Sequence, residues 1–203
     1  MQIINLLSDQ LPIFQYYPLG QEIGVGSDGQ VFEILNDPNK VIKFCIIYDC
    51  YNQPIHKLYN DTKNSLDYIK RCQPCVCTRV YEHDLLIRSS RQTVNGSQDY
   101  LIHYYVMEKL YKTTADERKV FHSILSHEDR GIIKDYTEPI VRDMLQGMRR
   151  GLDFDIEKVI LFYNNLINSP IRHPDIHVRN IMKNKQGEYR LIDFDNIKIG
   201  VKS

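Results

Sequence analysis

The chain has 203 residues, a length that allows one domain or two small lobes around a sizeable buried core. Lys and Arg number 26 and are balanced by 26 Asp and Glu, so the formal net charge is zero. We therefore expect no nucleic-acid partner, because binding to phosphate backbones requires an excess of positive charge. No apolar run approaches the roughly 18 residues needed to cross a bilayer, and no basic leader precedes the first apolar stretch. These patterns predict a cytoplasmic protein without a membrane span.

Five cysteines, an odd number, argue against a closed framework of disulfides. Three of them fall within CQPCVC, residues 72–77, at a spacing close enough to share a metal. A structural zinc site needs four ligands, so the fourth would have to be Cys45, Cys50 or a histidine such as His83. We favour reduced thiols in a short connector and keep the metal site as the alternative.

The first half of the chain alternates short runs rich in Val, Ile and Phe with turn-forming residues, which indicates β-strands. One segment differs, because its apolar residues recur at helical spacing; it predicts a helix over 55–71 that ends at Gln73 and Pro74. The polar connector at 89–99 predicts a mobile surface loop. The expected strands are 19–26, 30–35, 40–47, 78–88 and 100–107.

The second half of the chain changes to helical periodicity. Helices are expected over 117–127, 135–149 and 155–168. A small hairpin follows, in which the turn KNKQGE separates NIM from YRLI. A strand-rich lobe therefore precedes a helical lobe, with the boundary near 108–111.

Gly24, Gly26 and Gly29 have the spacing G-x-G-x-x-G and are followed by Val31. Glycines let a backbone approach phosphate oxygens closely and donate N–H groups to them. In a dinucleotide-binding motif the third glycine would open a helix, but here VFEIL continues as a strand. The glycines therefore fall in a hairpin turn, which favours a loop that covers the phosphates of ATP. An ordinary glycine-containing hairpin is the alternative.

Lys43 lies within the apolar run VIKF, on the same expected strand face as Val41 and Cys45. A lysine buried there requires an anion, and a phosphate would supply one. The alternative is a surface lysine on an edge strand. YYVMEKL, which ends the last expected strand of the first half, is by itself only a buried strand that leaves the core.

Two polar loops of the second half carry groups suited to phosphoryl transfer. In HPDIHVRN, Asp175 can orient a hydroxyl and accept its proton, while Asn180 can coordinate a metal bound to phosphates. In IDFD, Asp193 closes a strand and can reach a second metal position. Each loop taken alone also fits a solvated turn.

These motifs occur in one chain in a fixed order: glycine hairpin, strand lysine, helix, strand ending in MEKL, H-x-D-x-x-x-x-N and D-F-D. In that order the sequence resembles the protein-kinase-like superfamily over residues 19–198. The resemblance implies an α+β, bilobal protein-kinase-like fold, with an antiparallel β-sheet N-lobe that contains one helix and a reduced helical C-lobe. The implied organisation is an N-terminal extension (1–18), an N-lobe (19–108) and a truncated C-lobe (109–203).

The resemblance also implies roles for single residues, with ATP and Mg²⁺ as cofactors. The catalytic residues would be Asp175 as the base, Lys43 at the α- and β-phosphates and His177 near the γ-phosphate. Asn180 and Asp193 would bind the metal. The residues implied to hold the nucleotide are Gly24, Gly26 and Gly29 over the phosphates, Val31 and Met182 against the adenine, Met107 as gatekeeper, and Glu108 to Leu110 as the hinge.

The sequence departs from the family pattern at several points. Pro174 replaces the arginine that reads a phosphorylated activation loop. The D-x-H and D-F-D variants are similar to those of aminoglycoside and choline kinases. No glutamate occurs between Lys43 and Tyr81, so the lysine lacks its usual partner, and Asp61 and Asp67 lie off the expected helix face.

Only eight residues follow Asp195, so the segment that docks substrate in larger kinases is expected to be missing. The chain thus resembles the minimal kinase-like effectors that pathogens deliver into host cells, and small viral kinases. We expect an ATP- and Mg²⁺-dependent phosphotransferase, specifically a serine/threonine protein kinase, in the cytoplasm of its source or of a host cell. The alternatives are a pseudokinase that binds nucleotide and partners, and a small-molecule phosphotransferase.

A protein substrate and an activating protein partner are also expected. Lys43 lacks a glutamate that would hold the helix over 55–71 in place. An early end of the C-lobe would also leave apolar surface beside Phe194 and Ile197, and exposed apolar patches mark protein–protein sites. A partner that binds only the ordered form would shift the chain toward it.

Overall fold

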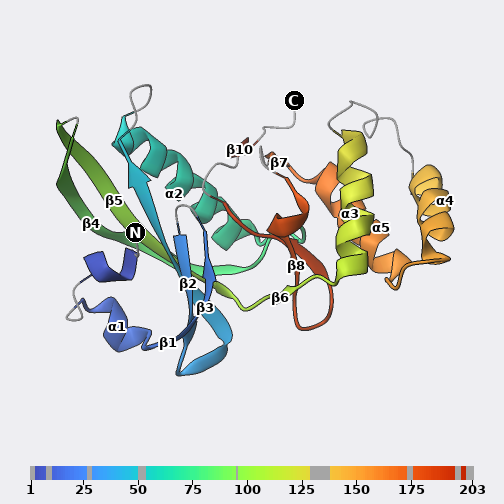
Figure 1. Ribbon diagram of the computed structural model, residues 1–203, viewed down its shortest axis with the longest axis horizontal. Coiled ribbons are helices and arrows are strands. Elements are labelled where there is room, and N and C mark those ends of the chain that lie inside the picture. The colour runs from blue at the N-terminus through green and yellow to red at the C-terminus, as the bar shows by residue number, and fades with distance from the viewer. Residues whose placement is uncertain are drawn as a thin grey trace. The chain divides into compact units, whose positions relative to one another are not determined.

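The structure, a computed structural model, describes residues 3–7, 11–26, 29–49, 54–94, 96–128, 138–172, 176–194 and 198–199. The chain divides into two compact units: Met1–Gln73 with Arg79–Lys109, and Pro74–Thr78 with Leu110–Ser203. Each unit has its own β-sheet structure, labelled in Figure 1.

Five antiparallel strands form the sheet of the first unit, in the order β1-β2-β3-β5-β4 (Figure 1). Val, Ile and aromatic residues fill these strands because such side chains pack well on a pleated, half-buried surface. All five expected strands are confirmed. The bounds are β1 (Leu19–Val25), β2 (Gly29–Ile34), β3 (Asp37–Tyr48), β4 (Val80–Thr93) and β5 (Gly96–Glu108).

The expectation of a mobile surface loop over 89–99 is wrong, because β4 and β5 continue through it as a long hairpin. Polar cross-strand pairs hold this hairpin together. Ser90 Oγ donates to Asp99 Oδ1 at 2.6 Å, and Arg91 Nη2 donates to Gln98 Oε1 at 2.9 Å. These residues lack hydrophobic alternation, so the sequence pattern gives no strand signal there.

Helix α2 (Ile55–Cys72) follows β3 in the chain and confirms the helix expected over 55–71. The helix ends where Gln73 takes a left-handed backbone with φ of 43° and donates its N–H to Ile69 O at 2.8 Å. Pro74 then prevents the helical pattern from continuing. The buried positions of the helix are Ile55, Thr62, Ser65, Leu66 and Ile69.

Helix α2 packs on the sheet face that carries Lys43. The Tyr59 ring of the helix lies 6.0 Å from the His103 ring of β5. His103 stacks at 6.3 Å on Tyr105, which pairs with Lys43 across the β3–β5 ladder. The lysine therefore shares its face of the sheet with the ring stack that α2 covers.

The opposite face of the sheet holds a large part of the core of the first unit. Ile42, Phe44 and Ile46 alternate along β3 and point into this core, as the pleat of a strand requires. The elements η1 (Ile3–Leu6) and α1 (Ile13–Tyr16) cover it. The N-terminal segment is therefore part of the packed core.

The described part of the second unit contains three α-helices at the places that the sequence predicts. They are α3 (Ala115–Glu128), α4 (Glu138–Arg149) and α5 (Ile156–Asn168). Residues 135–137, which the prediction for α4 includes, lie outside the described residues. Asp155 caps α5 by accepting the N–H groups of its first turn.

Short strands complete the second unit. β8 (Ile181–Lys183) and β9 (Tyr189–Leu191) form the hairpin expected around KNKQGE, and β6 (Tyr111–Lys112) pairs with β8. Gly187 in the hairpin turn has φ of 75°, a backbone that glycine adopts without strain. The remaining short elements are β7 (Ile171–Arg172), η3 (Val178–Asn180) and β10 (Lys198–Ile199).

The fold is therefore α+β. Its first unit is an antiparallel five-stranded sheet with α2 inserted between β3 and β4, and helices dominate its second unit. This arrangement confirms the fold class that the sequence indicates. None of the described helices is long and apolar enough to cross a membrane.

Truncation of Phe44 should be strongly destabilising. The ring is fully buried and makes edge contacts with Phe14 and Phe32, at centroid distances of 6.1 and 6.0 Å. We expect Phe44→Ala to lower the free energy of unfolding, measured in urea, by about 3–5 kcal/mol. Leu35→Ala is the control, because Leu35 is 70% exposed and its loss should change stability by no more than about 0.5 kcal/mol. Equal effects of the two variants would contradict the place of Phe44 in the core.

Candidate functional site

Strands β1 and β2 form the hairpin predicted from G-x-G-x-x-G. Gly24 pairs with Val31, and the Gly26 N–H donates to Gly29 O at 2.8 Å. Residues 27 and 28 lie outside the described residues. None of these three glycines takes a left-handed backbone, so what they contribute is the space that a missing side chain leaves.

Gly29 is the most tightly packed of the three glycines. A Cβ atom there would lie 2.7 Å from Lys43 Cε, so that the lysine side chain would have to shift, and a tight 3.2 Å from Phe44 O. A Cβ atom at Gly26 would lie no closer than 3.9 Å to Gly29 O. The Lys43 side chain therefore runs across Gly29, and the structure brings together two motifs that the sequence presents separately.

Lys43 is half-buried in the middle of the sheet. Its Nζ atom lies 5.5 Å from the centre of the Tyr105 ring, which is a cation–π contact. Val41 and Cys45, predicted to share its strand face, are buried. The alternative of a surface lysine on an edge strand is wrong, because β3 has β2 on one side and β5 on the other.

Asp67, an acidic residue of α2, contacts side chains other than Lys43. Asp67 lies 3.3 Å from Lys63 Nζ and 3.0 Å from His83 Nε2. Burial, together with the nearby charges of Lys70 and Lys63, lowers the pKa of His83 below its ordinary value although Asp67 raises it. At the centre of its buried face, α2 carries the uncharged residues Thr62 and Ser65.

The expected hinge begins at Glu108, the last residue of β5. Met107, the predicted gatekeeper, is buried. Glu108 and Lys109 donate their N–H groups to backbone carbonyls elsewhere in the first unit, at 3.0 and 2.8 Å. Leu110 is buried and begins the second unit. Two of the three predicted hinge amides are thus used to hold this segment in place.

Asn180 and Asp193 lie together at one end of the β8–β9 hairpin. Asn180 immediately precedes β8, and Asp193 follows β9 by two residues. The two strands are paired, and Ile192 extends the pairing by donating its N–H to Asn180 O at 2.9 Å. Asn180 is buried and Asp193 is half-buried. The two residues predicted as metal ligands are therefore neighbours in space.

The backbone of Asp193 is left-handed, with φ of 70°. Residues other than glycine adopt this conformation infrequently and at some cost, which is smaller for aspartate and asparagine than for the rest. Here the backbone before Asp193 is constrained because β9 is hydrogen-bonded on both of its sides. Beyond its pairing with β8, the backbone of Leu191 bonds to Thr78 N at 3.0 Å and to Val76 O at 2.7 Å. Residues held in this way are found preferentially at functional sites.

His177 caps the short helix η3. Its Nδ1 atom accepts the N–H of Arg179 at 3.1 Å, so the proton of the neutral ring resides on Nε2. Asp175, the predicted catalytic base, lies outside the described residues, as do Pro174 and Asp195.

Two further expectations concern the neighbourhood of β8 and β9. Met182 is half-buried in β8, where it pairs with Arg190 of β9. The expectation of exposed apolar surface beside Phe194 is wrong for that residue, because Phe194 is fully buried in the folded chain. Ile197 lies outside the described residues.

The sequence-based predictions miss Glu117, a buried carboxylate at the start of α3. It accepts hydrogen bonds from Lys183 Nζ at 3.0 Å, from Tyr189 OH at 2.8 Å and from Thr114 N at 2.7 Å. Burial raises the pKa of Glu117, but these three donors together lower it further, so the pKa lies below its ordinary value. One side chain thus ties α3 to both strands of the hairpin that carries Asn180 and Asp193.

A signal for Glu117 is nevertheless present in the sequence. Thr114 and Glu117 have the T-x-x-E spacing of a capping box, and Thr114 Oγ1 accepts the Glu117 N–H at 3.2 Å. The pattern locates the start of α3. It does not reveal the contacts with Lys183 and Tyr189, which lie far along the chain.

The cysteine-rich segment supports β9. Cys77 is buried within the segment that bonds to Leu191, and burial raises the pKa of its thiol to about 12. Cys72 and Cys75 are free and exposed. Within the described residues, no cluster of three or more His, Cys, Asp or Glu side chains is arranged to hold a metal.

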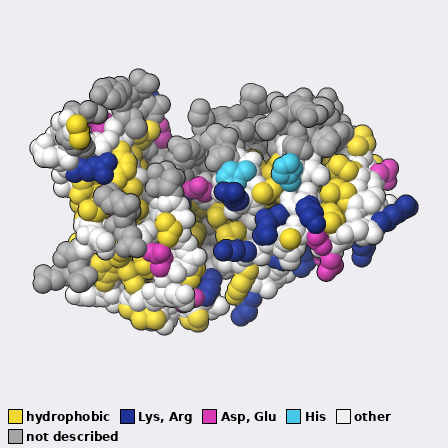
Figure 2. All heavy atoms as spheres, in the orientation of Figure 1, with side chains coloured by type: hydrophobic (Ala, Val, Ile, Leu, Met, Phe, Trp, Pro, Cys, Tyr) yellow, Lys and Arg dark blue, Asp and Glu magenta, His cyan; other side chains and the backbone are white. Residues whose placement is uncertain are grey.

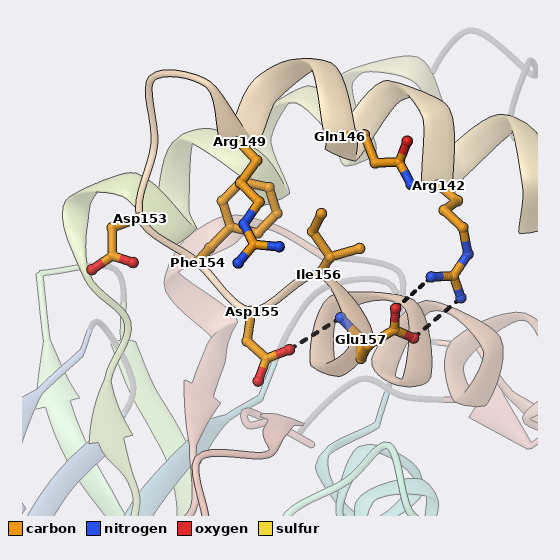
Figure 3. A pocket seen from close by; sticks show the side chains of 8 residues that line it. All are labelled: Arg142, Gln146, Arg149, Asp153, Phe154, Asp155, Ile156 and Glu157. Atoms are coloured by element: carbon orange, nitrogen blue, oxygen red, sulfur yellow. Dashed lines mark hydrogen bonds and ion pairs between the residues drawn. The ribbon is translucent and has the colours of Figure 1, made fainter.

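A hollow of about 610 Å³ lies between α4 and the start of α5 (Figure 3). No residue predicted for the nucleotide site lines it. Figure 3 shows Arg142 paired with Glu157, with Nη2 3.1 Å from Oε2, and Asp155 bonded to the first turn of α5. The Arg142–Glu157 pair joins α4 to α5, whereas the Asp155 bond lies within α5. The lining residues are Arg142, Gln146, Arg149, Asp153, Phe154, Asp155, Ile156 and Glu157.

Charge is unevenly distributed although the net charge is zero. On the face drawn in Figure 2, Lys and Arg side chains gather over the second unit. A local excess of positive charge attracts anions even when the whole chain is neutral.

No family model matches this chain, and no curated protein matches it. The solved structures that resemble it include a crystal structure of WbdD, with a TM-score of 0.44 and 16% identity over 92% of this chain and 34% of WbdD. A co-crystal structure of WbdD with a kinase inhibitor has a TM-score of 0.43 and 15% identity over 90% of this chain and 33% of the other. This chain spans about a third of the length of the WbdD chains in these two structures.

Replacing Glu117 should destabilise the fold in a pH-dependent way. Because its folded pKa is lowered, the carboxylate contributes stability above its ordinary pKa of 4.5, and that contribution is lost as pH falls through the folded value. We expect Glu117→Gln to cost about 2–4 kcal/mol at pH 7, since it also removes the partner of Lys183. In urea denaturation at pH 7 and pH 3, the gap from the wild type should narrow at the lower pH.

The control for this experiment is Asp143→Asn, which neutralises an exposed acid of α4. That variant should track the wild type at both pH values. A gap between Glu117→Gln and the wild type that stays constant with pH would contradict a stabilising carboxylate at this position.

Proposed function

We propose that this chain is an ATP- and Mg²⁺-dependent phosphotransferase and, within that class, a serine/threonine protein kinase. The observation that carries the proposal is the strained Asp193 beside Asn180. Glycine would occupy a left-handed position with less strain than aspartate. Aspartate tolerates this region better than most other residues, and its carboxylate beside Asn180 offers an oxygen ligand that glycine lacks.

The side chains of Asn180 and Asp193 suit Mg²⁺, which prefers oxygen ligands. A bound ion would neutralise phosphate charge and hold the transferred phosphoryl group in line. Asn180 has little freedom to move, because it is buried and its backbone bonds to His177 and Ile192. We assign both residues to the metal on these grounds.

The glycine hairpin and Lys43 are proposed to bind the phosphates. Gly29 gives the lysine side chain room to run beside the hairpin backbone. The Gly26 N–H is already bonded within the hairpin, so we assign the phosphate donors to other N–H groups of the turn. His177, with Nδ1 engaged as a cap, has Nε2–H as its donor to the γ-phosphate.

Adenine recognition is proposed at the hinge. Because Glu108 and Lys109 use their N–H groups internally, we assign the donor to the adenine to the Leu110 N–H. Val31, Met107 and Met182 remain its proposed apolar contacts.

The proposal includes the lobe organisation that the sequence implies: an N-lobe over 19–108, a C-lobe over 109–203 and an extension over 1–18. Asp175 is proposed to accept the proton of a serine or threonine hydroxyl on a protein substrate. An activating protein partner in the cytoplasm is also proposed. Support for the partner comes from α2, whose central buried positions are Thr62 and Ser65.

A second candidate is a nucleotide-binding module without turnover, and the same helix favours it. The sequence offers no glutamate to α2, and Asp67 is engaged with Lys63 and His83. Phosphoryl transfer depends on exact positioning of the lysine, whereas nucleotide binding tolerates looser contacts. The two candidates differ in turnover and share the nucleotide site.

Removing the Asp193 carboxylate should abolish the metal dependence of ATP binding. By isothermal titration calorimetry, Mg²⁺ should strengthen ATP binding to the wild type by about tenfold or more, because phosphates cannot face a carboxylate without a bridging cation. Asp193→Asn should show little difference between Mg²⁺ and EDTA. Asp153→Asn, which neutralises an exposed acid of the same unit, should behave like the wild type.

Equal ATP affinity of the wild type with and without Mg²⁺ would overturn the metal assignment. Asp193→Gly adds a test of the strain argument. This variant should lose the effect of Mg²⁺ and unfold at about the same urea concentration as the wild type, because the relief of left-handed strain is offset by the greater freedom of glycine in the unfolded chain.

Measurements of phosphotransfer should distinguish the role of Asp175 from the roles of the residues that bind ATP. We expect Asp175→Ala to lower phosphotransfer by roughly 10² or more and to leave ATP binding nearly intact, since a general base acts in the transition state. Lys43→Ala should also reduce transfer, because it removes a cation that positions the phosphates. The transfer of labelled γ-phosphate from ATP, measured with and without host-cell extract, tests both variants against the wild type. A wild type that binds ATP but transfers nothing under either condition would favour the binding module.

A further inference from the structure

Residues 3–17, as far as they are described, form a strap across the sheet face opposite α2. One end is attached to β2, where Ile4 N–H donates to Gln30 Oε1 at 2.9 Å. The other end is attached to β4, where the Tyr17 hydroxyl donates to the carboxylate of Glu82. Since β3 and β5 lie between β2 and β4, this N-terminal strap spans four strands. Its buried apolar residues are Ile3, Leu7 and Ile13.

Gln30 is bonded through both polar atoms of its side-chain amide. Oε1 accepts the Ile4 N–H of the strap, and Nε2 donates to Glu22 Oε2 on β1 at 2.6 Å. The residue is 2% exposed, follows Gly29 in the chain and pairs with Val25 across the hairpin. A single buried amide therefore joins the strap, β1 and β2 at the glycine end of the hairpin.

The rest of β1 is weakly held. It is an edge strand, and its ladder with β2 shifts register on both sides of Glu22. Such irregularities remove ladder hydrogen bonds. Ile23 and Val25, at the glycine end, are 39% and 69% exposed. The partly buried hydrogen bond from Gln30 to Glu22 thus joins β1 to β2 beside this weak stretch.

We propose that Gln30 is a positioning residue that makes the order of the glycine hairpin depend on the docked N-terminal strap. The inference rests on the proposed function in one respect, that this hairpin covers the phosphates of ATP. The strap would then raise nucleotide affinity without touching the nucleotide. The reason is that apparent affinity falls with the fraction of molecules whose hairpin is in the competent arrangement.

Hydrogen exchange of the ATP-free chain tests the structural half of the proposal. Gln30→Ala leaves the Ile4 N–H and the Glu22 carboxylate without their partner. We expect backbone amides of residues 24–31 to exchange about tenfold faster in this variant, as loss of a buried hydrogen-bonded pair implies. The matched control is Gln98→Ala, which removes a hydrogen-bonded glutamine from the β4–β5 hairpin and should leave residues 24–31 unchanged.

A double variant in which residues 22 and 30 swap their side chains distinguishes a positioning role of Gln30 from a simple loss of packing. The double variant Glu22→Gln, Gln30→Glu reverses donor and acceptor, so that the amide on β1 donates to a carboxylate on β2. That carboxylate still accepts the Ile4 N–H. We expect the double variant to regain most of the protection that Gln30→Ala loses. Unchanged exchange in Gln30→Ala, or no recovery in the double variant, would overturn the proposal.

Titration with Mg²⁺ and ATP tests the functional half. Gln30→Ala should bind about three- to tenfold more weakly than the wild type, and Gln98→Ala should not. If the wild type itself fails to bind ATP, the proposed function is wrong while the exchange result still stands. If the wild type binds ATP and Gln30→Ala binds it equally well, positioning by Gln30 is wrong.

Global unfolding of Gln30→Ala would appear as faster exchange in every strand, including β5. In that event Ile4→Pro provides the decisive variant, because it removes the N–H donor of the strap and leaves Gln30 and Glu22 in place. Faster exchange limited to the strap and residues 24–31 supports the proposal. Faster exchange of the strap alone overturns it.

Discussion

The buried carboxylate of Glu117 is the interaction on which the second unit depends. It satisfies the first turn of α3 and at the same time binds Lys183 of β8 and Tyr189 of β9. Burial of a charge is tolerated only when hydrogen bonds and an opposite charge compensate for lost hydration, and here both are supplied. The β8–β9 hairpin is thereby fixed against α3. Asn180 and Asp193 stand at the open end of that hairpin, so a structural carboxylate determines where the proposed metal ligands lie.

In the central strands of the first unit, neighbouring side chains point to opposite faces of the sheet, one of which is the core and the other of which carries Lys43. Phe44 faces the core beneath the N-terminal strap, while Lys43 faces the side that α2 covers. The same division recurs on β2, where Gly29 leaves space for the lysine and Gln30 bonds to the strap. Adjacent residues thus serve opposite faces of one sheet, because side chains of a strand point alternately to its two sides.

Much of the fold could be predicted from the sequence, and less of the candidate site. The helix over 55–71 and the five strands follow from local periodicity and are confirmed. The connector at 89–99 is a strand pair in spite of its polarity, because cross-strand hydrogen bonds replace the missing apolar alternation. Exposed apolar surface beside Phe194 was expected, but the folded chain buries that ring. The catalytic and binding roles of the motif residues stay predictions.

By itself the sequence determined the order and type of the elements and the presence of Lys43, Asn180 and Asp193 in a fixed succession. These are properties of short segments, in which propensity and spacing act between near neighbours. Only the tertiary structure decided that Glu117 meets Tyr189, 72 residues away, and that Gln30 meets Ile4, 26 residues away. It also decided the left-handed backbone of Asp193, which β8 and the segment ending at Thr78 impose on the end of β9. Contacts of this kind have no local pattern, because their energy arises only when distant parts of the chain are packed together.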